Sequence, residues 1–161
     1  MPDDLVKIAF NIDPEDWHLT SSEAVWAKVL KELGGFRVMN TPYFIRGISF
    51  MDVVLAKPIG PEGFLEFTGI VCERSGHSTY RLLVPPFDNT FHRMWKGLEE
   101  IGCTYECLRG IQTSLGEKDL FAVDVPPRAY IYKAYEVFAS GEREKIWLFE
   151  EGHVGHSLRD S

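Results

Sequence analysis

Residues 78–102 read STYRLLVPPFDNTFHRMWKGLEEIG, and this stretch decides the second half of the fold. Its first seven residues, STYRLLV, end at a Pro-Pro pair and predict a strand. Five apolar residues then recur at helical spacing: Phe91, Met94, Trp95, Leu98 and Ile101. Because Gly102 follows this series as a helix-ending residue, the pattern predicts an amphipathic helix that packs on a sheet.

The pattern continues downstream with two strands, a second helix and a last strand. The expected elements are strands at 103–108, 120–125 and 146–149, a turn at 114–118, and a helix from Pro127 to Gly141. Asp124 stands just before this helix, where we expect it to accept hydrogen bonds from free N–H groups. The order β-α-β-β-α-β is that of ferredoxin-like domains and predicts such a half at 78–150. We expect residues 151–161 to form a polar, frayed tail.

The first half, residues 1–77, is predicted to be rich in strands. Alternating or β-branched runs occur at 5–12, 52–57 and 64–73, with a short aromatic run at 43–45. Such short strands suit a small barrel or a curled sheet. We therefore expect an α+β protein with a barrel-like first half.

Residues 23–33 allow two interpretations. Thr20 and Glu23 stand at the spacing of a capping box, and apolar residues follow at helical intervals, which predicts a helix. The same residues also alternate, which fits a strand that turns at Gly34 into a second strand at 36–40. The residues alone leave this choice open.

Composition bounds the function. The chain has 161 residues, of which 45% are hydrophobic and 25% charged, as in ordinary globular proteins. Seventeen basic residues face twenty-four acidic ones, and the net charge of −7 argues against a nucleic-acid binder. The N-terminal residues lack a secretory signal, and no apolar run approaches the ~18 residues that span a bilayer, so we expect a cytoplasmic protein.

The densest polar cluster is residues 73–79, ERSGHST, at the border of the two halves. Arg74 could hold an anion, His77 could act as a general base, and Ser75 or Ser78 could be a nucleophile. No G-x-S-x-G elbow surrounds either serine. A polar turn in which Gly76 has a positive φ explains the same residues, and we expect this structural role to dominate.

Other candidate sites give weaker signals. His153 and His156 have no acidic or cysteine partner at a metal-site distance, so we expect them in the solvated tail and predict no metal site. Gly-rich phosphate loops do not occur, and we expect no cofactor. Four glutamates near the end form an acidic cluster that we expect to bind a partner: Glu142, Glu144, Glu150 and Glu151.

Several blocks together resemble a bacterial family of uncharacterised small proteins, known only as a domain of unknown function. The distinctive blocks are S-G-H-S-T at 75–79 and V-D-V-P-P at 123–127. The resemblance extends over about 5–150 and implies a bacterial cytosolic protein with a β first half and an α+β second half. It also implies that the segment around Trp26 is the first strand of a hairpin, which favours the strand interpretation. It brings no activity, cofactor or catalytic residue.

Three functions remain open on this basis. The negative charge and the missing catalytic motif favour a non-enzymatic module that binds a basic protein, such as an immunity-type inhibitor of a basic toxin. The alternatives are a small hydrolase or transferase, or a small-molecule sensor, that uses residues 74–79. We expect no binding to nucleic acid or membranes.

Overall fold

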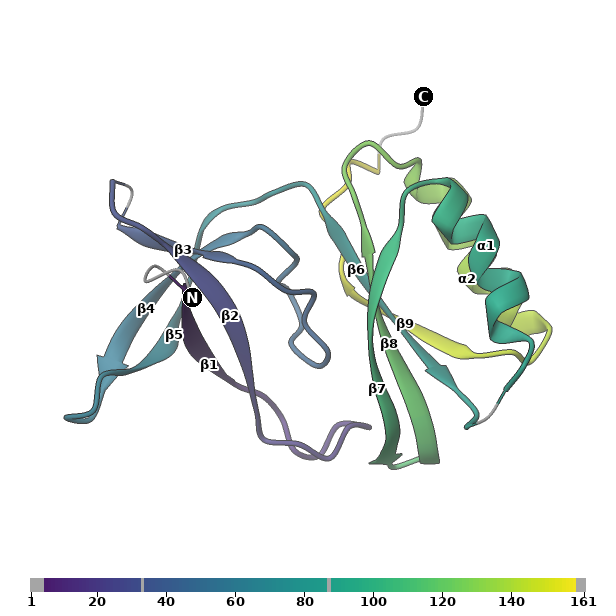
Figure 1. Ribbon diagram of the computed structural model, residues 1–161, viewed down its shortest axis with the longest axis horizontal. Helices are drawn as coiled ribbons and strands as arrows, with labels where there is room; N and C mark the ends of the chain where they lie inside the picture. Colours follow the sequence, from purple (N-terminus) through teal and green to yellow (C-terminus); the bar gives the residue numbers. More distant parts are fainter. Residues whose placement is uncertain (1–4, 33, 87, 159–161) are drawn as a thin grey trace.

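The chain folds into two parts that lie side by side, as the computed structural model in Figure 1 shows. The structure describes residues 5–32, 34–86 and 88–158. The first part is a closed barrel of five strands, and the second is a four-stranded sheet with two helices. The barrel strands are β1 (Leu5–Asn11), β2 (Ser22–Leu30), β3 (Gly35–Val38), β4 (Val53–Ile59) and β5 (Phe64–Glu73). The remaining elements are β6 (Ser78–Val84), α1 (Phe91–Glu100), β7 (Thr104–Thr113), β8 (Gly116–Val125), α2 (Ile131–Arg143) and β9 (Leu148–His153).

The barrel closes because β1 pairs on both sides, antiparallel with β2 and parallel with β5. Alternation along β1 sends Ile8 and Phe10 into the interior, as period-two patterning predicts. Side chains from the other strands and from the β3–β4 loop complete the barrel core: Val25, Ala27, Val38, Ile45, Ile48 and Val54.

Residues 22–30 form strand β2, so the strand interpretation is confirmed and the helix interpretation is wrong. Strand β2 pairs with β1 over its length and with β3 at its end. The carboxylate of Glu23, which would have closed the capping box, instead accepts the backbone N–H groups of Tyr43, Phe44 and Ile45 at 2.7, 2.8 and 3.0 Å. The helical spacing was incidental, because pairing with two neighbouring strands outweighs local propensity.

The second part is a sheet in the order β7-β8-β6-β9, with every neighbouring pair antiparallel. Both helices cover one face, and the barrel lies on the other side (Figure 1). The predicted stripe of α1 is confirmed, because Phe91, Trp95 and Leu98 are buried while Met94 and Ile101 are partly buried against the same core. They join Phe138 of α2 in a core that includes the helix-facing side of the sheet. The fold is therefore α+β and rich in strands, as predicted.

Several boundaries differ from the sequence prediction. Residues 43–45, expected as a strand, lie in the β3–β4 loop. Helix α2 begins at Ile131 and not at Pro127, because residues 126–129 form a turn closed by Ala129 N–H and Pro126 O at 2.9 Å. No helix in the described ranges is long and apolar enough to cross a membrane.

The expectation of a frayed tail at 151–161 is wrong for residues 151–156. Strand β9 continues to His153 and pairs with β6, and Gly152 is buried. The N–H groups of Gly155 and His156 then bind the hydroxyl of Ser78 at 2.9 and 3.3 Å. The pairing partners lie more than 70 residues away, so the local polar composition did not reveal them. Residues 159–161 of the predicted tail lie outside the described residues.

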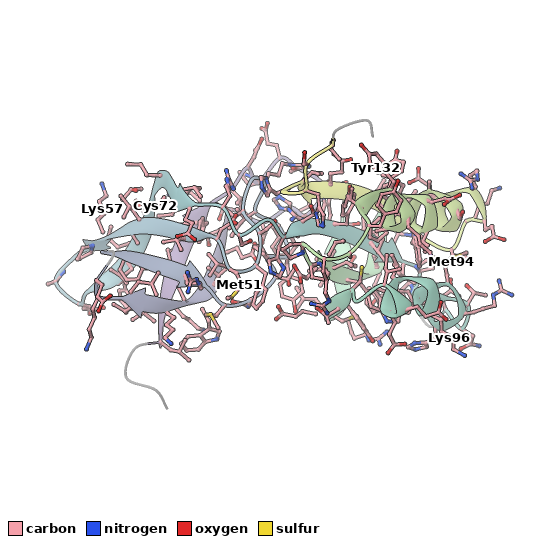
Figure 2. The ribbon with its side chains drawn as sticks, turned by 90° about the horizontal axis from the view of Figure 1, so that it is seen from above. Met51, Lys57, Cys72, Met94, Lys96 and Tyr132 are labelled. Atoms are coloured by element: carbon pink, nitrogen blue, oxygen red, sulfur yellow. The ribbon has the colours of Figure 1, made fainter. Side chains whose placement is uncertain are left out.

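Two barrel loops reach the helix-free face of the sheet. From the β1–β2 loop, Trp17 O accepts the N–H of Ser114 at 2.9 Å. From the β3–β4 loop, Ile45 O accepts the buried guanidinium of Arg81 at 2.7 Å. The molecule is elongated in the second view, with Lys57 and Cys72 toward the barrel end and Lys96 toward the helical end (Figure 2). We call the region where these loops meet the sheet the junction of the two parts.

Candidate functional site

The predicted cluster lies at this junction, because residues 74–77 connect β5 of the barrel to β6 of the sheet. Its centre is Asp52, whose side chain is 1% exposed. One carboxylate oxygen accepts the N–H of Ser75 at 2.8 Å, and the other accepts the N–H of Ser49 at 2.9 Å. A guanidinium nitrogen of Arg74 binds the second oxygen at 3.1 Å. Asp52 therefore holds the β3–β4 loop against the connection between the two parts.

Arg74 joins three segments rather than standing free. The nitrogen that binds Asp52 also donates to Gly47 O and lies 3.5 Å from Nε2 of His153. Burial lowers the pKa of His153, and the positive charge of Arg74 lowers it further. His153, expected in a solvated tail, thus belongs to this junction.

The two candidate nucleophiles are engaged in structural hydrogen bonds. The hydroxyl of Ser75 donates to Phe50 O at 2.7 Å and accepts the N–H of His77 at 3.2 Å. Ser78 is fully buried, and its oxygen lies 2.6 Å from Nδ1 of His156. Nε2 of His156 is 2.9 Å from Pro126 O, and because a carbonyl only accepts, Nε2 carries the proton. In the neutral ring, Nδ1 therefore accepts a hydrogen bond from the O–H of Ser78, whose oxygen accepts the two backbone N–H groups described above.

His77 pairs with Asp124, whose carboxylate oxygens lie 2.9 and 3.0 Å from Nδ1. Asp124 is therefore oriented to His77 and not to the helix N–H groups, which corrects the sequence expectation. Burial raises the pKa of Asp124, and the facing His77 opposes this rise. The ring of His77 stands edge-on to Phe50, with centroids 5.3 Å apart.

Glycines allow the close packing of this junction. Gly76 has a φ of +88°, as the turn interpretation predicts. At Gly155, a Cβ atom would lie 2.3 Å from His77 O, which no side chain could tolerate. The junction therefore depends on backbone approach as well as on side-chain hydrogen bonds.

The predicted acidic cluster divides into two groups. Glu150 belongs to an ion network with Arg46 at 3.0 Å and with the buried Arg81 at 3.3 Å, and it also accepts the indole N–H of Trp17 at 2.9 Å. It is thereby bound within the protein. Glu142, Glu144 and Glu151 are exposed.

The hydrogen bonds described above hold the barrel and the sheet together. In the described part of the chain, no serine hydroxyl is bonded to the His77 ring, and Ser78, which is bonded to the half-buried His156, is itself fully buried. Among the described residues, no group of three or more His, Cys, Asp and Glu side chains could hold a metal ion. Sequence reasoning missed Asp52 and placed His153 and His156 in a solvated tail, because the partners of all three are distant in the chain.

Comparison with known proteins gives a fold but no activity. A crystal structure of a hypothetical protein from Neisseria gonorrhoeae matches with a TM-score of 0.75 at 18% identity, covering 94% of this chain and 96% of that one. No curated protein matches. The profile of a domain of unknown function (DUF4265) matches residues 23–149, which is most of the chain. The chain therefore belongs to the family of that domain, DUF4265.

Proposed function

We propose that the protein acts by binding a basic protein partner and not by turnover. The observation that carries the proposal is the state of the candidate nucleophiles: the hydroxyl of Ser78 is buried and saturated, and that of Ser75 is bonded to backbone on both sides. A residue in such a role stabilises the fold but is not available to attack a substrate.

Charge supports the choice of partner. The net charge of −7 steers a positively charged protein toward the molecule and raises its association rate. Glu142, Glu144 and Glu151 leave carboxylates exposed near α2 and β9. An immunity-type inhibitor that neutralises a basic toxin in the cytoplasm is one function of this kind. We also infer that the second part has ferredoxin-like topology, which its element and sheet order support.

One observation favours an enzyme or a sensor as the second candidate. Asp124 fixes Nδ1 of His77, which is how a general base is oriented, and the imidazole is not fully buried. In this alternative, Arg74 and His77 would contact a small anionic ligand.

The test is affinity capture from a bacterial lysate with the full-length tagged protein, at about 0.05 M and about 0.5 M salt. We expect a basic protein to be captured at low salt and to be captured in a smaller amount at high salt. Replacement of Glu142, Glu144 and Glu151 by Lys should abolish its capture. Glu62→Lys, at the exposed β4–β5 turn, is the matched control and should leave it unchanged.

Two results would contradict the proposal. One is that no basic protein is captured while native mass spectrometry finds a bound metabolite. The other is that capture is insensitive to salt and to all charge variants. If His77→Ala then releases the metabolite, the second candidate replaces the first.

A further inference from the structure

Strand β9 is an edge of the four-stranded sheet, and in the described chain it has no strand on its outer side. The N–H of Phe149 points outward, because its acceptor is the carboxylate of Glu142 on α2, at the long distance of 3.4 Å. Further along the strand, Gly152 O accepts the N–H of Gly47 from the barrel loop at 2.9 Å. The edge is therefore closed by the barrel at one end and capped weakly by a side chain at the other.

A shallow, open groove lies between Phe149 of this edge and helix α2. It has a volume of about 580 Å³ and is lined by Tyr135, Ala139, Glu142, Arg143 and Phe149. The ring of Tyr135 stands edge-on to Phe149, with centroids 5.7 Å apart, and is 46% exposed. Tyr135, Ala139 and Phe149 give the groove its apolar lining, and Glu142 and Arg143 give it charged lining.

Two carboxylates lie at or beside the groove. Glu142 lines it, and Glu151 follows Phe149 by two residues on the same side of β9. Burial raises the pKa of Tyr80, and the charge of Glu151 and its hydrogen bond with the Tyr80 hydroxyl raise it further. Arg143, the only cation among the lining residues, is bonded to Ser140 at 3.0 Å. The groove is thus complementary to an apolar residue flanked by cations.

Exposed tyrosines extend this surface along α2. Tyr130 and Tyr132 are 65% and 42% exposed, and their rings lie 5.6 Å apart. Figure 2 shows Tyr132 at the outer surface of the helical part. Tyrosine is enriched at protein interfaces because it combines apolar area with a polar end.

We propose that an extended basic segment of the partner adds to β9 as a fifth strand of the sheet. Its carbonyl takes the N–H of Phe149 from Glu142, which is thereby free to bind a Lys or Arg of the segment. An apolar side chain of the segment lies on Phe149 and Ala139, and a second cation meets Glu151. Main-chain pairing provides affinity and the groove provides selectivity, as in other strand-addition complexes. This inference rests on the proposed function.

The opposite edge of the sheet is a poorer site. Strand β7 carries a register shift between Leu108 and Ile111, where Gly110 has a φ of +62°. Such a bulge bends a strand and discourages addition of another. The side chain of Glu106 on β7 is also bound to the barrel, through Thr41 N–H at 2.6 Å.

The experiment is a nuclear magnetic resonance titration of the full-length protein with the synthetic peptide Lys-Thr-Val-Thr-Lys, whose alternate residues place Val between two Lys on one side. We expect shifts concentrated in β9 and α2, and slower exchange of the Phe149 amide. Glu142→Gln and Glu151→Gln should each weaken binding about 2- to 5-fold, as for exposed ion pairs. Glu99→Gln on α1 is the matched control. The peptide with N-methyl groups at alternate positions keeps its charge but should lose binding, because it cannot pair with an edge strand.

Ala139→Arg should fill the groove and abolish binding, and the two glutamate variants keep the test valid if this variant does not fold. The proposal is overturned if the peptide does not bind, if its shifts map elsewhere, or if the N-methylated peptide binds equally well. Capture from a lysate distinguishes a failure of the β9 site from a failure of the proposed binding function. If Ala139→Arg still captures a basic protein, the binding function stands and the β9 site is wrong; if the unaltered protein captures none, the proposed function itself fails.

Discussion

Replacement of Asp52 by Ala should destabilise the junction more than any other single change in it. The carboxylate accepts two backbone N–H groups, from Ser49 and Ser75, and the guanidinium of Arg74. Hydrogen bonds to charged groups contribute about 1.5–3 kcal/mol each, and loss of the acceptor leaves both N–H groups without it. Because Arg74 is half exposed, we count only the two backbone bonds and expect a loss of about 3–6 kcal/mol in the free energy of unfolding.

Urea denaturation followed by circular dichroism measures this loss. In a chain of this size, it corresponds to a decrease in Tm of about 6–24 °C. Arg74→Met is the control and should cost about 1 kcal/mol or less, because an exposed cation keeps its hydration when it loses its partner. A loss below about 1 kcal/mol for Asp52→Ala, with an unchanged slope against urea, would refute the central role of this carboxylate.

Three further predictions concern stability. Trp95→Ala should cost about 3–5 kcal/mol, because the side chain is buried between α1 and the sheet; a loss below about 1 kcal/mol in chemical denaturation would mean that the helix is not packed there. Gly76→Ala should cost about 1 kcal/mol or more, because φ is +88° and Pro127 lies 3.4 Å from the added methyl group; an unchanged Tm would argue against this turn. The folded-state pKa of His153 lies below its ordinary value of 6.5, so the unfolded chain binds a proton first and stability should decrease as the pH falls below 6.5. His153→Gln should make that decrease shallower in denaturation curves recorded at several pH values, and an unaltered slope would exclude His153 as its source.

The second half could be predicted because its signals are local. Helix α1 carries an apolar stripe that only a helix can place on one face, and Pro and Gly residues mark the ends of neighbouring elements. Residues 22–30 show the opposite case. Glu23 does not close a capping box there, because its carboxylate accepts the backbone N–H of Tyr43, in a loop 20 residues away.

The candidate site was only half visible in the sequence for the same reason. Residues 74–78 are contiguous and attract attention, and their structural role was expected from Gly76. Their partners Asp52, Asp124 and His156 come from three other segments, up to 78 residues distant. Pairings of this range follow from the packing of the barrel on the sheet, which no spacing rule in one sequence describes.

The position of β9 next to β6 has a consequence for synthesis on the ribosome. The barrel strands are consecutive in the chain, so residues 5–73 can pair as soon as they emerge. Strand β6 has β8 on one side and β9 on the other, and the hydroxyl of Ser78 at its start needs Gly155 and His156. During translation, therefore, the barrel can be complete while the edge of β6 that later pairs with β9 is still unpaired. This edge stays unpaired until residues 148–156 emerge. A ribosome stalled before that point would present an aggregation-prone strand to the cell, and chaperones that bind nascent chains should act on this protein in that interval.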